Sequence, residues 1–155
     1  MKNVMLFCFI FQSIFLNAQT GWTEKKVENG RFYLSFPNVP SYSEGLGWTA
    51  YDKDSQVTYY ISFMEVPSKN ETTIAIVEKF LLPSMMEDDI LVSKSYLKYL
   101  GSNAIDFLYK AKQTPILYKK GRVIVRNNNL YVLQVHYYHN DLANFDKFSK
   151  SLRFY

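Results

Sequence analysis

The sequence predicts an α+β protein in which a sheet is packed beside helices. Most of the chain after residue 30 consists of short runs rich in Tyr, Phe, Ile, Val and Thr, separated by turn residues, which is typical of strands. Two stretches instead repeat apolar residues every three to four positions, and this spacing indicates helices. Several extended runs are apolar on both faces, so we expect a sheet that is covered on both sides.

The first eighteen residues have the pattern of a signal peptide. Lys2 gives a positive start, the run from Val4 to Leu16 is almost uninterrupted by polar residues, and Ala18 is a small residue at a cleavage position. This run is shorter than the about 20 apolar residues that a transmembrane helix needs. We therefore predict a signal peptide over residues 1–18, export to the periplasm or the extracellular space, and no integral membrane segment after cleavage.

Residues 19–155 are predicted to form one globular domain. Chains of about 150 residues bury enough surface for a single core, and the sequence contains no internal repeat and no long linker. The only cysteine, Cys8, lies in the leader. The domain would therefore have no thiol for a disulfide, a metal site or nucleophilic catalysis.

In the first half of the domain, the elements are expected in the order strand, loop, hairpin, helix. A short strand at Phe32–Phe36 ends at Pro37, and the Ser/Gly-rich stretch 41–47 is predicted as a loop. Runs 48–52 and 57–66 are predicted to pair as a hairpin.

A helix is expected to follow, because Ser68 and Glu71 have capping-box spacing and Ile74, Val77, Phe80 and Leu81 recur at helical intervals. Pro83 should kink or divide this helix, since proline lacks a backbone N–H and clashes with the preceding turn.

In the second half, strands are expected at 91–100, 104–112, 116–126 and 130–139. The predicted turns are Gly101-Ser102 and Asn127–Asn129, because asparagine tolerates the positive φ of a tight hairpin. Gly121 is expected to mark a bulge or a further turn. A last helix should begin near residue 140 and present one apolar face made of Leu142, Phe145 and Phe148.

Three stretches of the sequence resemble PsbP-like and Mog-type domains: Gly30-Arg31-Phe32-x-Leu34-x-Phe36-Pro37-x-x-Pro40, Leu130-Tyr131, and Phe148-x-x-Ser151-Leu152-Arg153-Phe154. The resemblance covers roughly Trp22 to Tyr155. It implies a PsbP-like α/β/α sandwich, with an antiparallel sheet of six or more strands flanked by helices.

The resemblance also implies a class of function. Photosynthetic members of this family type are extrinsic subunits that help to retain ions at a membrane complex, and Mog-type members bind a small GTPase. No partner-binding residue matches one to one, so neither role is carried over. The resemblance implies only a non-enzymatic accessory or binding module.

Catalytic and metal-binding motifs are missing from the sequence. It contains no Gly-rich phosphate loop, no Gly-x-Ser-x-Gly and no His-Glu-x-x-His. His136 and His139 would lie on opposite faces of a strand, so we expect one exposed histidine and one partly buried histidine bonded to a neighbour. The acids Glu87-Asp88-Asp89 are expected to be solvated. We therefore predict no enzymatic activity, no metal and no cofactor.

Basic residues gather where acids are absent, between Asp106 and Asp141. The candidate binding residues in this interval are Lys110, Lys112, Lys119, Lys120, Arg122, Arg126, Tyr118 and Tyr131. The favoured function is an exported, non-catalytic binding or accessory domain that engages an anionic envelope component or a protein partner. Export disfavours nucleic acid as the partner. Alternatively, the lysines protect a sheet edge from aggregation.

A second hypothesis is a small-ligand carrier or hydrolase. Its pocket would lie between the sheet and the loop from Pro37 to Trp48, with Trp22 and Trp48 as candidate lining residues. A deep cavity with converging polar groups would favour it.

Overall fold

The computed structural model describes residues 21–65, 74–85, 88–138 and 142–155. The predicted signal peptide, the capping box at Ser68–Glu71, the predicted solvated acid Glu87 and His139 lie outside the described residues.

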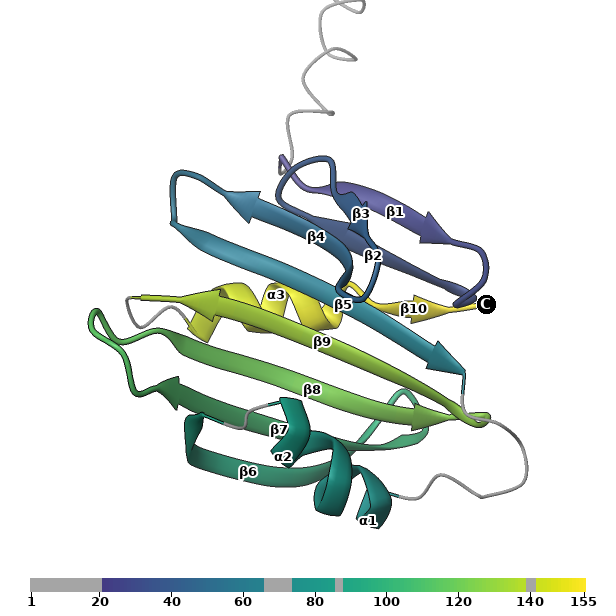
Figure 1. The fold of residues 1–155 in the computed structure, drawn as a ribbon. Helices are drawn as coiled ribbons and strands as arrows, with labels where there is room; N and C mark the ends of the chain where they lie inside the picture. Colours follow the sequence, from purple (N-terminus) through teal and green to yellow (C-terminus); the bar gives the residue numbers. More distant parts are fainter. Residues whose placement is uncertain (1–20, 66–73, 86–87, 139–141) are drawn as a thin grey trace, which may run out of the picture.

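Seven antiparallel strands form the main sheet, in the order β3-β4-β5-β9-β8-β7-β6 (Figure 1). This confirms the antiparallel sheet of six or more strands. Its strands are β3 (Ser41–Ser43), β4 (Gly47–Asp52), β5 (Val57–Glu65), β6 (Asp89–Tyr99), β7 (Ser102–Ala111), β8 (Tyr118–Arg126) and β9 (Asn129–Tyr137). The stretch 41–47, predicted as a loop, thus contains the short strand β3.

A smaller sheet lies beside the main one and joins the two ends of the domain. It has the order β1-β2-β10, with β1 (Thr23–Val27) and β10 (Arg153–Phe154) pairing on either side of β2 (Phe32–Phe36). The sequence analysis predicted only β2, because β1 is mainly polar and β10 is very short. Each of these strands depends on its partner rather than on its own pattern.

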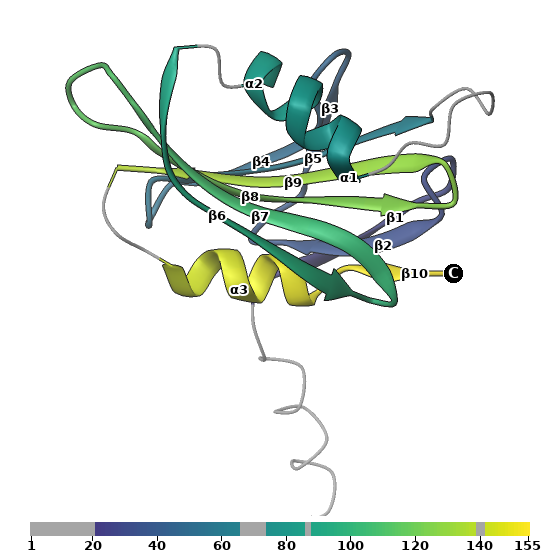
Figure 2. The ribbon, with the colours of Figure 1, turned by 90° about the horizontal axis from the view of Figure 1, so that it is seen from below.

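Helices lie on opposite faces of the main sheet (Figure 2). Helix α3 (Leu142–Lys150) packs on one face together with the small sheet, and its Phe145 and Phe148 are fully buried, as predicted. The other face carries α1 (Ile74–Ile76), the π-helical turn η2 (Val77–Leu81) and α2 (Leu82–Met85).

Pro83 lies within α2 and does not end the helix. The turn before it is π-helical, and Leu82 N–H donates to Val77 O. The wider π turn accompanies the proline, which cannot donate the next backbone hydrogen bond. The predicted interruption is therefore a local widening of the helix rather than a break between two helices.

Two hairpins turn through residues with positive φ. Asn127 (φ 49°) and Asn128 (φ 60°) connect β8 to β9, and Leu100 (φ 49°) and Gly101 (φ 78°) connect β6 to β7. Positive φ at both central residues is the type I′ geometry, which matches the twist of antiparallel strands. The asparagine turn is confirmed, and the Gly101 turn lies one residue earlier than predicted.

Gly121 lies in the middle of β8 and marks neither a bulge nor a turn, so that prediction was wrong. It pairs in regular register with Phe107 on β7 and Gln134 on β9. A Cβ atom here would lie 2.3 Å from Phe107 Cζ and 2.6 Å from Leu133 O. Glycine is required because the phenyl ring of Phe107 lies across the strand at this position.

The two faces of the sheet are covered to different extents. The α3 face is the larger core, where Tyr59 and Ile61 of β5 pack against α3 and the small sheet. On the other face, Val77 and Leu82 pack over the buried residues of β7, β8 and β9. Residues of β4 and β5 on this second face are only half-buried or exposed, so the predicted two-sided cover is partial.

Replacing Gly121 by alanine should destabilise the domain by about 2 kcal/mol, because Phe107 must move to admit the methyl group. Urea unfolding of the domain measures the change. Gly21→Ala is the matched control, since nothing lies within 4 Å of a Cβ atom there. Equal stability of the two variants would contradict the close packing described here.

Candidate functional site

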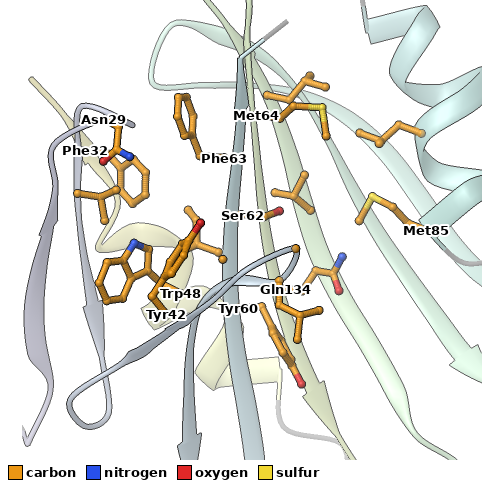
Figure 3. Close-up of a pocket in the computed structure, with 18 of the residues that line it drawn as sticks. Asn29, Phe32, Tyr42, Trp48, Tyr60, Ser62, Phe63, Met64, Met85 and Gln134 are labelled. Carbon is orange, nitrogen blue, oxygen red and sulfur yellow. The ribbon is translucent and has the colours of Figure 1, made fainter.

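A groove of about 950 Å³ opens on the incompletely covered face and extends around the free edge of β5 (Figure 3). The β3–β4 turn forms one wall, η2 and α2 form the opposite wall, and β5 and β9 form the floor. The lining residues are Val27, Asn29, Phe32, Tyr42, Gly45, Leu46, Gly47, Trp48, Tyr60, Ile61, Ser62, Phe63, Met64, Leu81, Met85, Lys119, Leu130, Val132, Gln134 and His136.

Gly47 holds the first wall against the floor. Its φ is +84°, and a Cβ atom would lie 2.2 Å from Ile61 O, so only glycine brings the chain this close to β5. β4 begins here, whereas β5 continues to Glu65. The end of β5 therefore reaches beyond β4 and forms the edge around which the groove turns.

Aromatic and flexible apolar side chains make up much of the lining. Tyr42 and Trp48 contact each other with ring centroids 5.3 Å apart, and Tyr42 is 64% exposed. Met64 and Met85 lie on the floor and the far wall (Figure 3). Methionine adapts its shape to a bound apolar group at little energetic cost.

Polar side chains gather at one end of the groove. His136 Nε2 lies 2.9 Å from Gln134 Oε1, and because an amide oxygen only accepts, Nε2 carries the proton. The Tyr60 ring contacts the imidazole at a centroid distance of 4.5 Å. These contacts confirm the expectation of a partly buried histidine bonded to a neighbour.

The pKa of His136 is lowered from 6.5 to about 4, mainly by burial and in addition by the nearby Lys119 ammonium, while Asp89 opposes the change. The imidazole is therefore neutral at pH 7. Lys119 Nζ lies 2.7 Å from Asp89 Oδ2, and the Asp89 side chain is only 7% exposed. Asp89 begins strand β6 rather than standing as a solvated acid at a helix end.

The predicted basic residues are divided between the two faces, because neighbours in a strand alternate. Lys119 pairs in register with His136 and faces the groove, whereas its neighbour Lys120 pairs with Val135 and faces α3. The α3 face also takes Lys110, Tyr118, Arg122, Arg126 and Tyr131, by their register positions. Lys112 follows the end of β7.

Arg122 is a buried structural residue. It is 8% exposed, and its Nε and Nη2 donate to the two Asp106 carboxylate oxygens at 2.6 and 2.8 Å. The guanidinium also lies 4.1 Å from the centroid of the Tyr99 ring. This bidentate geometry fixes β8 against β7 beneath α3.

Other members of the predicted patch also have partners within the fold. Lys120 Nζ lies 4.0 Å from Asp146 Oδ1, and Arg126 Nη1 donates to Leu100 O at 3.1 Å. Tyr131 is 4% exposed and donates to Gly30 O at 3.1 Å. The Tyr118 ring stacks on Tyr137.

Lys110 and Lys112 differ from Lys119 and Lys120, since neither has a carboxylate within 4.0 Å among residues 21–65, 74–85, 88–138 and 142–155. Of the two tryptophans, Trp48 lines the groove, while Trp22 packs on Tyr59 in the larger core.

Sequence reasoning missed Gln134, Ser62 and Met85 as groove residues. Alternation along β5 and β9 could have placed the first two on one face, but nothing local indicated that this face is left uncovered. Within the part of the chain that the structure describes, no helix is long and apolar enough to cross a bilayer. No group of three or more His, Cys, Asp or Glu side chains there could hold a metal ion.

The fold is similar to that of a solved PsbP structure. The solution structure of cyanobacterial PsbP (CyanoP) from Synechocystis sp. PCC 6803 matches with a TM-score of 0.67 at 12% sequence identity, over 86% of this chain and 92% of that chain. A crystal structure of a protein of unknown function from Pseudomonas aeruginosa has a TM-score of 0.48 at 13% identity, over 81% and 88% of the two chains. No protein-family model and no curated protein matches the sequence. The chain has a PsbP-like fold, and the Mog-type part of the resemblance stays a prediction.

Replacing Arg122 by methionine should destabilise the domain by about 2 kcal/mol, because Asp106 loses its partner in a part-buried position. Lys120→Met, on the same face, should cost less than about 1 kcal/mol, since its ion pair is long and its partner is exposed. Urea unfolding of the two variants measures both losses of stability. A smaller loss for Arg122→Met than for Lys120→Met would show that Arg122 is not a structural residue.

The stability of the domain should fall between pH 6.5 and about 4 because of His136. The unfolded chain protonates this ring at its ordinary pKa of 6.5, whereas the folded ring stays neutral until its pKa of about 4. The contribution of the neutral imidazole to the free energy of unfolding is therefore complete above pH 6.5. It is lost as the pH falls through this window, by up to roughly 3 kcal/mol.

Urea unfolding at pH 7 and pH 4.5, compared with His136→Gln, isolates this contribution. The carboxylates titrate in both proteins, so their effect cancels. The groups that face the ring, Lys119 and Asp89, are also retained in both. Parallel pH profiles for the two proteins would rule out a depressed pKa of His136.

Proposed function

We propose that the chain is an exported, non-catalytic binding domain that holds a small, largely apolar ligand in the groove. The observation that carries this proposal is the groove itself, whose volume of about 950 Å³ falls in the range of about 300–1,000 Å³ typical of small-molecule sites. Its location corresponds to the pocket considered from the sequence, between the sheet and the segment 37–48. Export rests on the leader pattern of residues 1–18.

The composition of the lining supports a ligand rather than water alone. Tyr42, Leu46 and Met64 remain more than half exposed at the groove, although large apolar side chains are normally buried. A bound apolar molecule would remove this surface from water at roughly 25 cal/mol per Å². The polar groups at one end would fix the orientation of the ligand.

A carrier fits the geometry better than a hydrolase. His136 Nε2 donates to Gln134 rather than facing a hydroxyl, and Ser62 pairs in register with Val132, away from the imidazole. Among the described residues, no serine or threonine hydroxyl is hydrogen-bonded to His136 in the arrangement that activates a nucleophile.

A second candidate is docking of an acidic protein or an anionic envelope component at the β7–β8 connection. The supporting observation is that Lys110 and Lys112 have no carboxylate within 4.0 Å among the described residues. Tyr118 lies at the start of β8, next to them. Lys120 and Arg122 pair with Asp146 and Asp106 of this domain. The candidate surface is therefore confined to the β7–β8 connection.

The groove proposal predicts that the neutral apolar dye Nile red binds the domain with increased fluorescence. Ser62→Trp should abolish the increase, because the indole would fill the floor of the groove. Ser95→Trp is the matched control, since Ser95 is exposed on the edge strand β6. Unchanged binding in Ser62→Trp, or loss in Ser95→Trp, would place the apolar site elsewhere and reject the proposal.

A further inference from the structure

We propose that the ligand of the groove is an amphipathic monocarboxylate, an apolar chain with a single carboxylate that binds to Lys119 and Gln134. This inference rests on the proposed function and adds the chemical class of the ligand. Its starting point is charge, because Lys119 is the only charged side chain among the described residues that line the groove. An apolar site with one cation at its end is complementary to a molecule with one anionic head.

Lys119 can serve a ligand and its present partner together. Its ammonium carries three N–H donors, Asp89 Oδ2 lies on one side as an ion-pair partner 2.7 Å away, and the lysine side chain remains 23% exposed. A carboxylate arriving from the groove would therefore share the ammonium with Asp89. The buried Asp89 charge also limits the head group to a single negative charge, because a dianion such as a phosphate monoester would be repelled.

Gln134 supplies the second donor. Its Oε1 is occupied by His136 Nε2 at 2.9 Å, so the amide nitrogen points away from the imidazole. This nitrogen has no hydrogen-bond partner among residues 21–65, 74–85, 88–138 and 142–155. Lys119 pairs with His136 and Gly121 pairs with Gln134, so the lysine and glutamine are diagonal neighbours on one face. Two donors on the same face can each bind one oxygen of a carboxylate that lies between them.

The rest of the groove suits an aliphatic chain. Beyond the polar end, the floor and far wall present Tyr60, Val132, Met85 and Leu81, with Met64 at the edge of β5 (Figure 3). None of the lining residues on this path is charged. A flexible hydrocarbon chain can follow such a surface without leaving a buried polar group unsatisfied.

Displacement of Nile red by decanoate and by decan-1-ol at pH 7 tests the inference. The two molecules have the same chain and differ in the head group. Decanoate should bind roughly tenfold more tightly than the alcohol, which is the scale of a charge-assisted hydrogen bond. Lys119→Gln should remove this preference without weakening decan-1-ol, and Lys119→Arg should retain it. Asp89→Asn should increase it, since the competing carboxylate is gone.

Lys120→Gln is the matched control, because it removes the same charge from the next residue on the opposite face. It should leave the preference unchanged. Equal affinity of decanoate and decan-1-ol in the unmodified domain would overturn the carboxylate inference and leave the groove as an apolar site. Loss of the preference in Lys120→Gln instead of Lys119→Gln would also overturn it. If neither molecule displaces the dye and the dye itself does not bind, the proposed function fails.

Discussion

The pairing of β5 with β9 is the constraint on which the rest of the molecule depends. It joins the hairpins of the first half of the domain to the meander of the second half, in an unbroken register from Thr58↔His136 to Glu65↔Asn129. Because side chains alternate along a strand, this register decides which residues enter the core and which line the groove. A slip of one residue would exchange Tyr59 with Tyr60, and this exchange would disrupt the core and the groove together.

The incomplete cover of one face follows from the order of the strands. β5 lies inside the sheet and β6 forms its far edge, so the chain between them must cross the face over β9, β8 and β7. The helical turns of η2 and α2 cover the strands along this path, and nothing in the described chain crosses above β4 and β5. The other face receives the nine-residue α3 and the small sheet together. The groove thus results from the order of the strands. Flexible side chains such as Met64 and Met85 line it.

Features that depend on neighbours in sequence could be predicted, and features that depend on distant partners could not. The Asn127-Asn128 turn is local, because positive φ is a property of those residues. Gly121 was misinterpreted because its reason is the Phe107 ring on another strand. The basic interval likewise suggested a charged surface. Arg122 is neutralised by Asp106, however, which stands at the border of that interval and becomes a neighbour of Arg122 only when β7 and β8 pair. The groove could be located near segment 37–48, whereas its polar end required the register of β9.

Strand alternation also explains why the number of charges in a segment is a poor guide to a binding face. Lys119 and Lys120 are consecutive, yet one faces an open groove and the other packs beside Phe145 of α3. On the α3 face, Lys120 and Arg122 pair with carboxylates and Arg126 lies over the Phe154 ring, so little of their charge is left for a ligand. On the groove face, Lys119 is also paired, with Asp89 Oδ2 2.7 Å from its Nζ. It lies among mostly apolar lining residues, however, where the effective dielectric constant is lower and water competes less. The surroundings of each lysine are therefore a better guide to a ligand site than the number of lysines in the segment.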